Sequence, residues 1–200
     1  MDTKLTGKTR IESDLIGARE IPAEALYGVQ TLRGIENFSI SKFRLSEYPL
    51  FIKGLAITKR AAAMANFELG LLTVEQKDAI IAACGEIIDG KHHDQFPVDM
   101  IQGGAGTTTN MNANEVIANR ALELMGHERG EYQYCSPNDH VNCSQSTNDA
   151  YPTAIHIGMY FKHLQLLPHL EELIASFRKK GEEFSRIIKM GRTQLEDAVP

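Results

Sequence analysis

The most regular hydrophobic pattern of the chain lies in its last quarter. Apolar residues return to one side at helical spacing over about residues 149–190, which predicts one long helix. At 1.5 Å per residue this helix is on the order of 60 Å long, whereas a compact domain of this size has a radius of gyration of roughly 16 Å. We therefore expect its apolar stripe to pack against helices from further chain or other subunits. The stripe comprises Ile155, Met159, Leu166, Leu170, Leu173, Phe177, Phe184 and Ile188.

Two shorter helices are predicted in the first half of the chain. The Ala-rich run over residues 50–69 contains good helix formers, and Gly70 follows it at the position of a helix stop. Thr73 and Gln76 have the spacing of a capping box, in which each side chain bonds to the backbone N–H of the other residue. A second helix is therefore expected over about residues 74–89.

The rest of the chain is less regular. The first fifty residues mix short β-prone pieces with turn formers, which predicts a small irregular arm with one hairpin. Residues 91–113 are polar and rich in glycine, and a third helix is expected over about residues 114–125, where Gly126 ends it. The pattern predicts a mainly α protein. The final stretch, residues 191–200, is expected to be a loop.

The composition indicates which class of ligand the protein binds. The 200 residues are 42% apolar and 24% charged, with a net charge of -5, which is typical of a soluble globular protein. No basic cluster indicates nucleic acid, and no segment has the length of a signal peptide or membrane span, so we expect a cytoplasmic protein that binds small molecules. Cys84, Cys135 and Cys143 are odd in number and are expected to be free thiols.

Three polar segments concentrate hydroxyl and amide side chains next to a predicted helix end. They are residues 102–112, 144–152 and 191–197. The first has three glycines before a helix, so its backbone N–H groups could hold an anion, although a plain turn explains it as well. Its spacing matches neither nucleotide-binding glycine motif. Because the segments favour neutral donors, a small dicarboxylate is the ligand we expect.

Ordinary helix capping accounts for part of the second segment. Pro152 is tolerated in a first helical turn, and Asn148 or Asp149 is a good cap. Capping leaves Ser146 and Thr147 without an explanation. We predict no metal site and no cofactor, because the adjacent histidines before Asp94 are joined by no further ligand cluster.

The polar segments also resemble a known family. GGAGTTTNMNANEVIANRALELMG, SPNDHVNCSQSTNDAYPT and MGRTQLEDAVP are similar, in order and spacing, to the amino-terminal blocks of the aspartase/fumarase superfamily. The resemblance covers essentially the whole chain. It implies a homotetramer whose subunits pool their helices in one bundle and share active sites. It also implies an amino-terminal domain over residues 1–145 and the start of the bundle domain over 146–200.

The chemistry that the resemblance implies is an elimination that gives fumarate. A serine base takes a proton, and neutral donors and helix amino termini hold the resulting aci-carboxylate dianion. The residues that match the β-carboxylate ligands of the family are Thr107, Ser146 and Thr147.

The remaining family positions concern the other end of the substrate. Asn148 and Gln194 match residues that contact the leaving group, and these are the two catalytic positions that the resemblance assigns. Thr193 matches a ligand of the α-carboxylate. The family's serine loop, of the form GSSxMPxKxNP, does not occur in the 200 residues, so the base is not among them.

At two positions this chain differs from the fumarases, which favours the aspartase branch of the superfamily. Fumarases typically carry His where this chain has Gln194, and His where it has Ser136 in an accessory dicarboxylate site. The resemblance therefore implies an aspartate ammonia-lyase activity, with L-aspartate and fumarate as substrate and product. Some aspartases have His at the position of Gln194, which leaves its direct role open. Fumarate hydration and a non-catalytic module that retains the fold are the alternatives.

Overall fold

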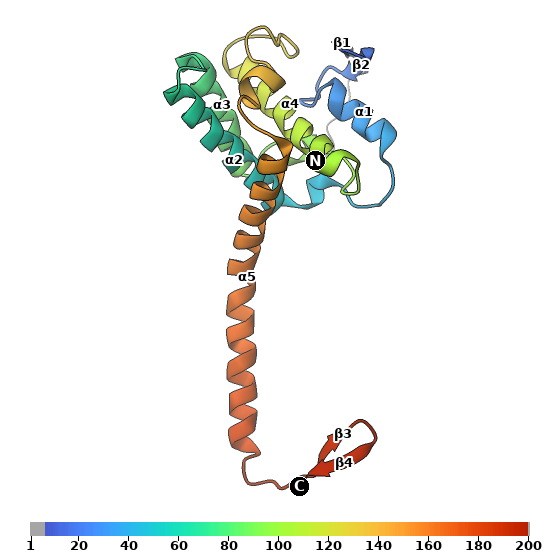
Figure 1. Ribbon diagram of the computed structural model, residues 1–200, viewed down its shortest axis with the longest axis vertical. Coiled ribbons are helices and arrows are strands. Elements are labelled where there is room, and N and C mark those ends of the chain that lie inside the picture. The colour runs from blue at the N-terminus through green and yellow to red at the C-terminus, as the bar shows by residue number, and fades with distance from the viewer. Residues whose placement is uncertain (1–6, 200) are drawn as a thin grey trace. The chain divides into compact units, whose positions relative to one another are not determined.

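The computed structural model describes residues 7–199, except for the side chains of Thr193, Asp197 and Val199 (Figure 1). It contains two compact units, residues 1–160 and 161–200. The first unit holds most of the helices and the hydrophobic core, and strands occur only as two short antiparallel pairs within the described residues. The expected mainly α fold is confirmed.

The expected hairpin is present near the amino terminus. Strands β1 (Thr9–Asp14) and β2 (Gly17–Pro22) pair antiparallel along their whole length. The carboxylate of Asp14 closes the turn by accepting from the backbone N–H groups of Ile16 at 2.9 Å and Gly17 at 3.1 Å.

Helix α1 (Val29–Asn37) differs from the expectation of an irregular arm in this part of the chain. Its N-cap residue, Gly28, has no side chain that could cap the helix. The missing acceptor is the buried carboxylate of Glu115, which lies far along the chain. This carboxylate accepts from the backbone N–H groups of Gly28 at 2.8 Å, Gln30 at 2.8 Å and Thr31 at 3.0 Å.

The two predicted helices of the first half are confirmed almost to the residue. Helix α2 spans Pro49–Glu68 and helix α3 spans Val74–Ile88. The capping box is formed. The Thr73 hydroxyl accepts from the backbone N–H of Gln76 at 3.2 Å, and the side-chain Oε1 of Gln76 accepts from the backbone N–H of Thr73 at 3.1 Å. The backbone turns left-handed at Gly70, as expected of a helix stop.

Helix α4 spans Thr107–Leu124 and begins seven residues before the predicted start. Its first turn is rich in Thr and Asn, which are weak helix formers, and a side chain from outside the helix stabilises it. Gln102 accepts from the Thr109 N–H at 2.7 Å and donates to the Thr109 hydroxyl at 2.8 Å. In the first unit α4 lies between the α2–α3 pair and α1, where it forms the centre of the core (Figure 1).

Short helical turns connect these elements. A π-helix, Pro137–Val141, is capped by Ser136 and was not expected from the sequence. Three-residue 3-10 helices occupy Leu45–Glu47, His93–Gln95 and Gly104–Gly106. All three cysteines are free, and Cys84 and Cys135 are buried.

Helix α5 spans Thr147–Glu183 and confirms the long helix. It begins two residues before the predicted start and ends seven residues before the predicted end. Its first turns bury Ala150, Ala154 and Gly158, and the last of these approaches the backbone of α2 closely.

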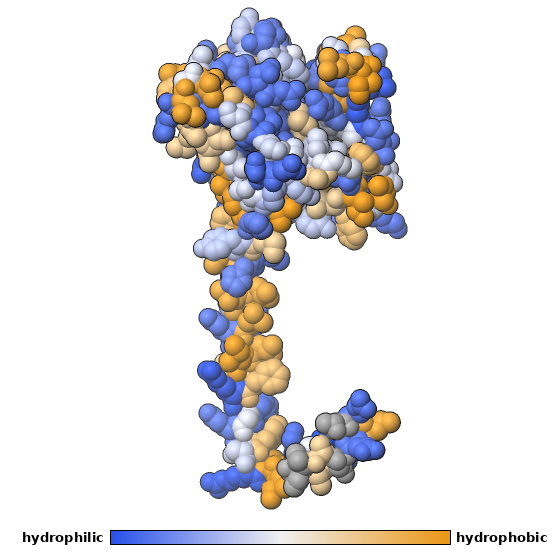
Figure 2. Space-filling view, viewed as in Figure 1, coloured by the Kyte–Doolittle hydropathy of each residue, from blue (hydrophilic) through white to orange (hydrophobic). Residues whose placement is uncertain are grey.

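The apolar stripe further along α5 stays uncovered among the described residues. From Leu166 onward its side chains are between 42% (Leu170) and 92% (Ile188) exposed. The space-filling view shows these apolar side chains along the helix (Figure 2). Within residues 161–200, the described residues therefore leave this part of the stripe uncovered.

The stretch predicted to be a loop contains a hairpin instead. Strands β3 (Gly191–Thr193) and β4 (Glu196–Val199) pair antiparallel, and Gln194 adopts a left-handed conformation in the turn. The strands were missed because two very short strands carry little periodicity. Within the described residues, no helix is both long enough and apolar enough to cross a membrane.

Candidate active site

The first polar segment forms a tight turn that leads into α4. Gly104, Ala105 and Gly106 all have positive φ, at 73°, 50° and 92°. A Cβ at Gly106 would lie 2.5 Å from ring carbons of Tyr151 in the first turns of α5. The backbone at the start of α4 can therefore approach α5 only because glycine stands there.

Thr107 is the first residue of α4 and is exposed. Its hydroxyl donates to the carbonyl oxygen of Gly104 at 2.6 Å, which closes the turn. To donate to a ligand, this hydroxyl has to leave the Gly104 carbonyl. Its position at a helix amino terminus, where the helix dipole is positive, nevertheless suits an anion.

Ser146 is the cap of α5, which corrects the expectation that Asn148 or Asp149 is the cap. The Ser146 hydroxyl accepts from the backbone N–H of Asn148 at 3.2 Å. The carbonyl of Ser146 also accepts from the N–H groups of Asp149 and Ala150. Capping therefore explains Ser146 and leaves Thr147 as the residue of this segment that capping does not explain.

Thr147 ends a chain of hydrogen bonds that starts in the core. Its Oγ1 accepts from Asn110 Nδ2 at 3.2 Å, and the same amide donates to Asn142 Oδ1 at 3.1 Å. Asn142 Oδ1 also accepts from Lys59 Nζ at 2.8 Å. The described residues offer the Thr147 hydroxyl proton no acceptor, so that proton is left for a ligand.

Lys59 is fully buried on α2, with Asn142 as its hydrogen-bond partner. Burial lowers the pKa of its ammonium group to about 7. No carboxylate of the described residues lies within ion-pair distance of it. The site therefore has a buried lysine behind its neutral donors.

Asn148 is exposed and lines a cavity of about 420 Å³ between the glycine turn and the start of α5. The structure thus brings the first and second polar segments together, as the chemistry requires. The other residues that line this cavity are Met100, Gln102, Ala105, Gly106, Tyr151 and Pro152.

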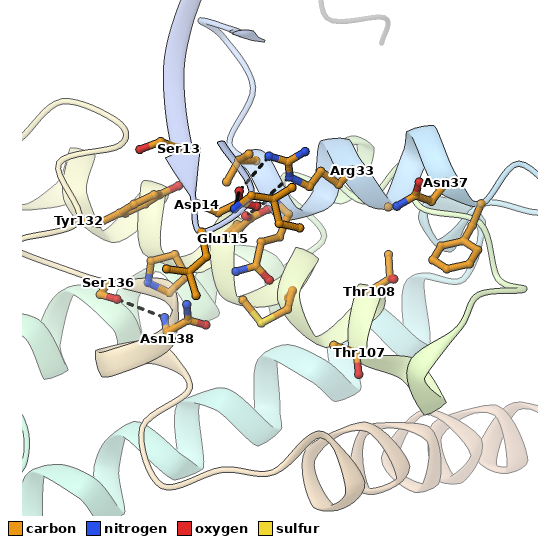
Figure 3. Close-up of a pocket in the computed structure, with 18 residues that line it drawn as sticks. Ser13, Asp14, Arg33, Asn37, Thr107, Thr108, Glu115, Tyr132, Ser136 and Asn138 are labelled. Carbon is orange, nitrogen blue, oxygen red and sulfur yellow. Dashed lines mark hydrogen bonds and ion pairs between the residues drawn. The ribbon is translucent and has the colours of Figure 1, made fainter. Parts of the chain in front are cut away.

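A larger cavity, of about 760 Å³, is lined in part by Thr107 and Thr108 (Figure 3). Arg33 is the one cationic side chain among the described residues that line it. Its guanidinium makes two 2.8 Å contacts with the Asp14 carboxylate, whose pKa this hydrogen bonding lowers to about 2. Because Asp14 neutralises the charge of Arg33, this cavity is a weaker binding site for a dianion than the helix amino termini are.

Ser136 lines the larger cavity together with Asn138 (Figure 3). Its hydroxyl accepts from the backbone N–H groups of Asn138 at 3.3 Å and Asp139 at 3.1 Å, and it donates to the Asp139 carboxylate at 2.9 Å. Ser136 therefore has a full set of partners as the cap of the π-helix.

Gln194 belongs to the second compact unit, where it is exposed in the β3–β4 turn. The side chain of Thr193 lies outside the described residues. The third polar segment is therefore described only by itself, and its part in the site remains a prediction.

Lys59 and Asn142 were not expected from the sequence as part of the site, whereas Asn110 lies within the first polar segment, residues 102–112. Lys59 was passed over inside an Ala-rich run, although it shares a helix face with buried Leu55 and Ala63. A lysine on an otherwise apolar face was the signal that could have found it. Asn110 and Asn142 carry no comparable signal, since only the fold joins them.

The site consists of two helix amino termini with hydroxyl and amide donors, which is an arrangement typical of enzymes that bind small dianions. A family model described as a lyase matches residues 17–200, and the chain belongs to this family. It is part of the fumarate lyase superfamily, as the resemblance of the polar segments predicts.

The similarity of the chain to curated proteins supports the same family. The chain is 60% identical over 191 residues to an aspartate ammonia-lyase of Pseudomonas canavaninivorans, covering 96% of this chain and 40% of the relative. It is 56% identical over 197 residues to the aspartate ammonia-lyase of Escherichia coli K12, covering 98% of this chain and 41% of the relative. The chain thus spans about two fifths of the length of these relatives.

Solved structures give the same fold. A fumarate lyase:delta crystallin from Brucella melitensis, solved bound to cobalt, has a TM-score of 0.91 and 54% identity, over 96% of this chain and 42% of that one. A class II fumarase from Schistosoma mansoni has a TM-score of 0.86 and 39% identity, over 96% and 40%. Within the described residues of our chain, no three His, Cys, Asp or Glu side chains group to hold a metal ion.

Proposed function

We propose that the protein is an aspartate ammonia-lyase, of which this chain contributes part of the substrate site. One observation carries the proposal: the amino-terminal turns of α4 and α5 meet, and Thr147 has a hydroxyl proton without an acceptor between them, among the residues that the structure describes. Helix amino termini and neutral hydroxyl donors suit a dicarboxylate whose charge increases during elimination. The identity to aspartate ammonia-lyases supports the choice of substrate.

In this proposal Thr107, Ser146 and Thr147 face the β-carboxylate of L-aspartate. When the base removes a β proton, this carboxylate becomes an aci-carboxylate dianion. The Ser146 and Thr147 hydroxyl protons stabilise it directly, and the Thr107 hydroxyl does so after it leaves the Gly104 carbonyl. The elimination then breaks the bond from the α carbon to nitrogen and gives fumarate and ammonia. The base lies outside the 200 residues.

Asn148 and Gln194 contact the leaving amino group in this proposal, and Thr193 binds the α-carboxylate. The cavity beside Asn148 supports its assignment, because the glycine turn before Thr107 lines the same cavity. For Gln194 and Thr193 the support is their match to the family motif.

We also propose that the protein is a homotetramer whose active sites are shared between subunits. The exposed stripe of α5 supports this, since large contiguous apolar patches are rarely left in water by monomers. The division at residues 145 and 146, with the bundle domain beginning after it, and the cytoplasmic location are part of the same proposal.

A spectroscopic assay of the full-length protein tests the activity. We expect ultraviolet absorbance of fumarate to grow with L-aspartate and not with L-malate. Growth with L-malate alone would instead favour fumarate hydratase, the second candidate, which the likeness to the Schistosoma mansoni fumarase supports. Growth with neither substrate would support a non-catalytic role.

A further inference from the structure

A buried lysine is the feature of this molecule that packing does not explain. Lys59 is 0% exposed, yet its ammonium group has one amide oxygen, Asn142 Oδ1, as its hydrogen-bond acceptor among the described residues. Burying a cation without a carboxylate is costly, and an apolar residue on this face of α2 would avoid that cost. We therefore expect Lys59 to have a role besides packing.

The hydrogen bonds of Lys59 indicate which side chains this role involves. In its ammonium form Lys59 can only donate, and in the structure Asn142 turns its oxygen, and not its nitrogen, toward Lys59 Nζ. The same oxygen then accepts from Asn110, which must turn its nitrogen inward. Each amide orientation thus follows from the one before it.

The chain of hydrogen bonds ends at the proposed substrate site. Asn110 donates to Thr147 Oγ1 at 3.2 Å, so the Thr147 hydroxyl accepts inward and its proton points elsewhere. The cost of this orientation is visible, because Asn110 Oδ1 is buried without a partner among the described residues. Buried polar atoms normally have a hydrogen-bond partner, so we infer that the neighbouring side chains fix the orientation of the Asn110 amide.

We propose that Lys59 is a positioning residue that acts through Asn142 and Asn110 to present the Thr147 hydroxyl as a donor to the substrate's carboxylate. The proposal rests on the proposed function, in which Thr147 binds the carboxylate that becomes the aci-carboxylate. Asn142 Nδ2 also donates to the Gln145 carbonyl oxygen at 3.2 Å, so Lys59 and Gln145 together hold the Asn142 oxygen toward Asn110. Without Lys59 the Asn142 oxygen keeps only Asn110 as a donor among the described residues, and Asn110 and Thr147 can turn.

A double-mutant cycle in the full-length protein tests this. Lys59→Met removes the donor and keeps an unbranched side chain, and Thr147→Val removes the last link. Because the hydroxyl meets a charge that grows in the transition state, we expect each variant to lower kcat by about tenfold or more and to change KM by less than about threefold. The double variant should be no worse than the poorer single variant, since both remove the same interaction.

A merely structural role for Lys59 predicts the opposite pattern. Losses in kcat that multiply in the double variant would overturn the proposal, and so would a Lys59→Met enzyme with wild-type kcat. Lys91→Met, at an exposed lysine after α3, is the control and should keep wild-type kinetics. Circular dichroism and size-exclusion chromatography check that each variant is folded.

If Lys59→Met does not fold, Asn142→Leu breaks the same chain at its middle and enters the same cycle with Thr147→Val. Non-additive losses in that cycle support the proposal, and multiplying losses overturn it. Failure of the proposed function is distinguishable, because then the wild-type protein itself does not convert L-aspartate. An active wild type with an additive cycle removes only the role of Lys59.

Discussion

At the scale of single residues, the site depends on which hydroxyl protons are already engaged. Thr107 donates to Gly104, whereas the hydroxyls of Ser146 and Thr147 only accept within the described part of the chain. A hydroxyl that accepts inside the protein is oriented to donate outside it. Ser146 and Thr147 are therefore better oriented than Thr107 to donate to the β-carboxylate in the proposed function.

Thr147→Val keeps the shape of the side chain and removes this donor. A hydrogen bond to a charged group contributes about 1.5 to 3 kcal/mol, so we expect kcat/KM for L-aspartate to fall by roughly tenfold to a hundredfold. Steady-state kinetics of the full-length protein measure this, and the tetramer should persist in size-exclusion chromatography. Thr153→Val, the same change at an exposed position of α5, is the control. Near wild-type kinetics for Thr147→Val would refute its assignment.

Glu86 gives a second prediction at this scale, about stability. Hydrogen bonds from Arg120 at 2.6 and 2.8 Å, and then from His92, lower its pKa from 4.5 to about 2. A carboxylate with a depressed pKa stabilises the fold above its unfolded pKa, and this stability is lost as the pH falls through the folded pKa. The stabilisation should therefore be complete above about pH 5 and fade toward about pH 2.

We expect Glu86→Gln to lower the stability of the full-length protein at pH 7 by about 2 kcal/mol, because Arg120 loses one of its two carboxylate acceptors and keeps only Glu123. The apparent melting temperature, measured between pH 7 and pH 3, should fall less steeply with acid than in the wild type. Glu68→Gln, at an exposed position near the end of α2, should change neither quantity appreciably. A variant as stable as wild type at pH 7 would contradict the prediction.

At the scale of elements, helices depend here on partners that their own sequence does not contain. Helix α1 is capped by Glu115 from α4, and the first turn of α4 is held by Gln102. Helix α5 meets α2 through small residues, since Gly54 lies against the backbone carbonyl of Ala154. This close approach positions the start of α5 in the core.

Two glycine-to-alanine changes test that approach. In Gly54→Ala the new methyl group meets the Ala154 carbonyl, so α5 must shift, and overpacking of this kind typically costs about 1 to 3 kcal/mol. Gly85→Ala in α3 meets nothing within 4 Å and should stabilise the helix by roughly 0.5 to 1 kcal/mol. Melting temperatures of the two full-length variants should therefore move in opposite directions. A stabilising Gly54→Ala would show that the helices are not in close contact.

At the scale of the whole molecule, the uncovered stripe of α5 connects fold and assembly. Leu166, Leu173 and Phe177 are each at least half exposed, although residues of this kind are normally buried. In the proposed homotetramer, helices from other subunits cover this stripe.

The 200-residue chain produced alone should associate and should release no ammonia from L-aspartate. Association follows from the apolar stripe, and inactivity follows because the family's serine loop is not in its sequence. Light scattering and an ammonia assay measure the two properties. Replacing Leu166, Leu173 and Phe177 together by Gln should reduce association without restoring activity. A well-behaved monomer that deaminates aspartate would contradict both interpretations.

The sequence by itself determined the elements whose information is local. The capping box at Thr73 defined the start of α3, glycine ended α2, and the long period of apolar residues predicted α5, because propensity, capping and periodicity act within a few residues. The roles of Thr107, Thr147 and Asn148 were predicted from the resemblance of their segments to the family motifs, and these roles stay predictions.

Only the tertiary structure decided what depends on distant partners. Helix α1 and the early start of α4 rest on Glu115 and Gln102, which no local pattern connects to them. The link from Lys59 to Thr147 crosses 88 positions of sequence through two amides, and side-chain hydrogen bonds of this kind have no period to detect. Burial joined them, because a buried polar group must find its partner wherever the fold brings one.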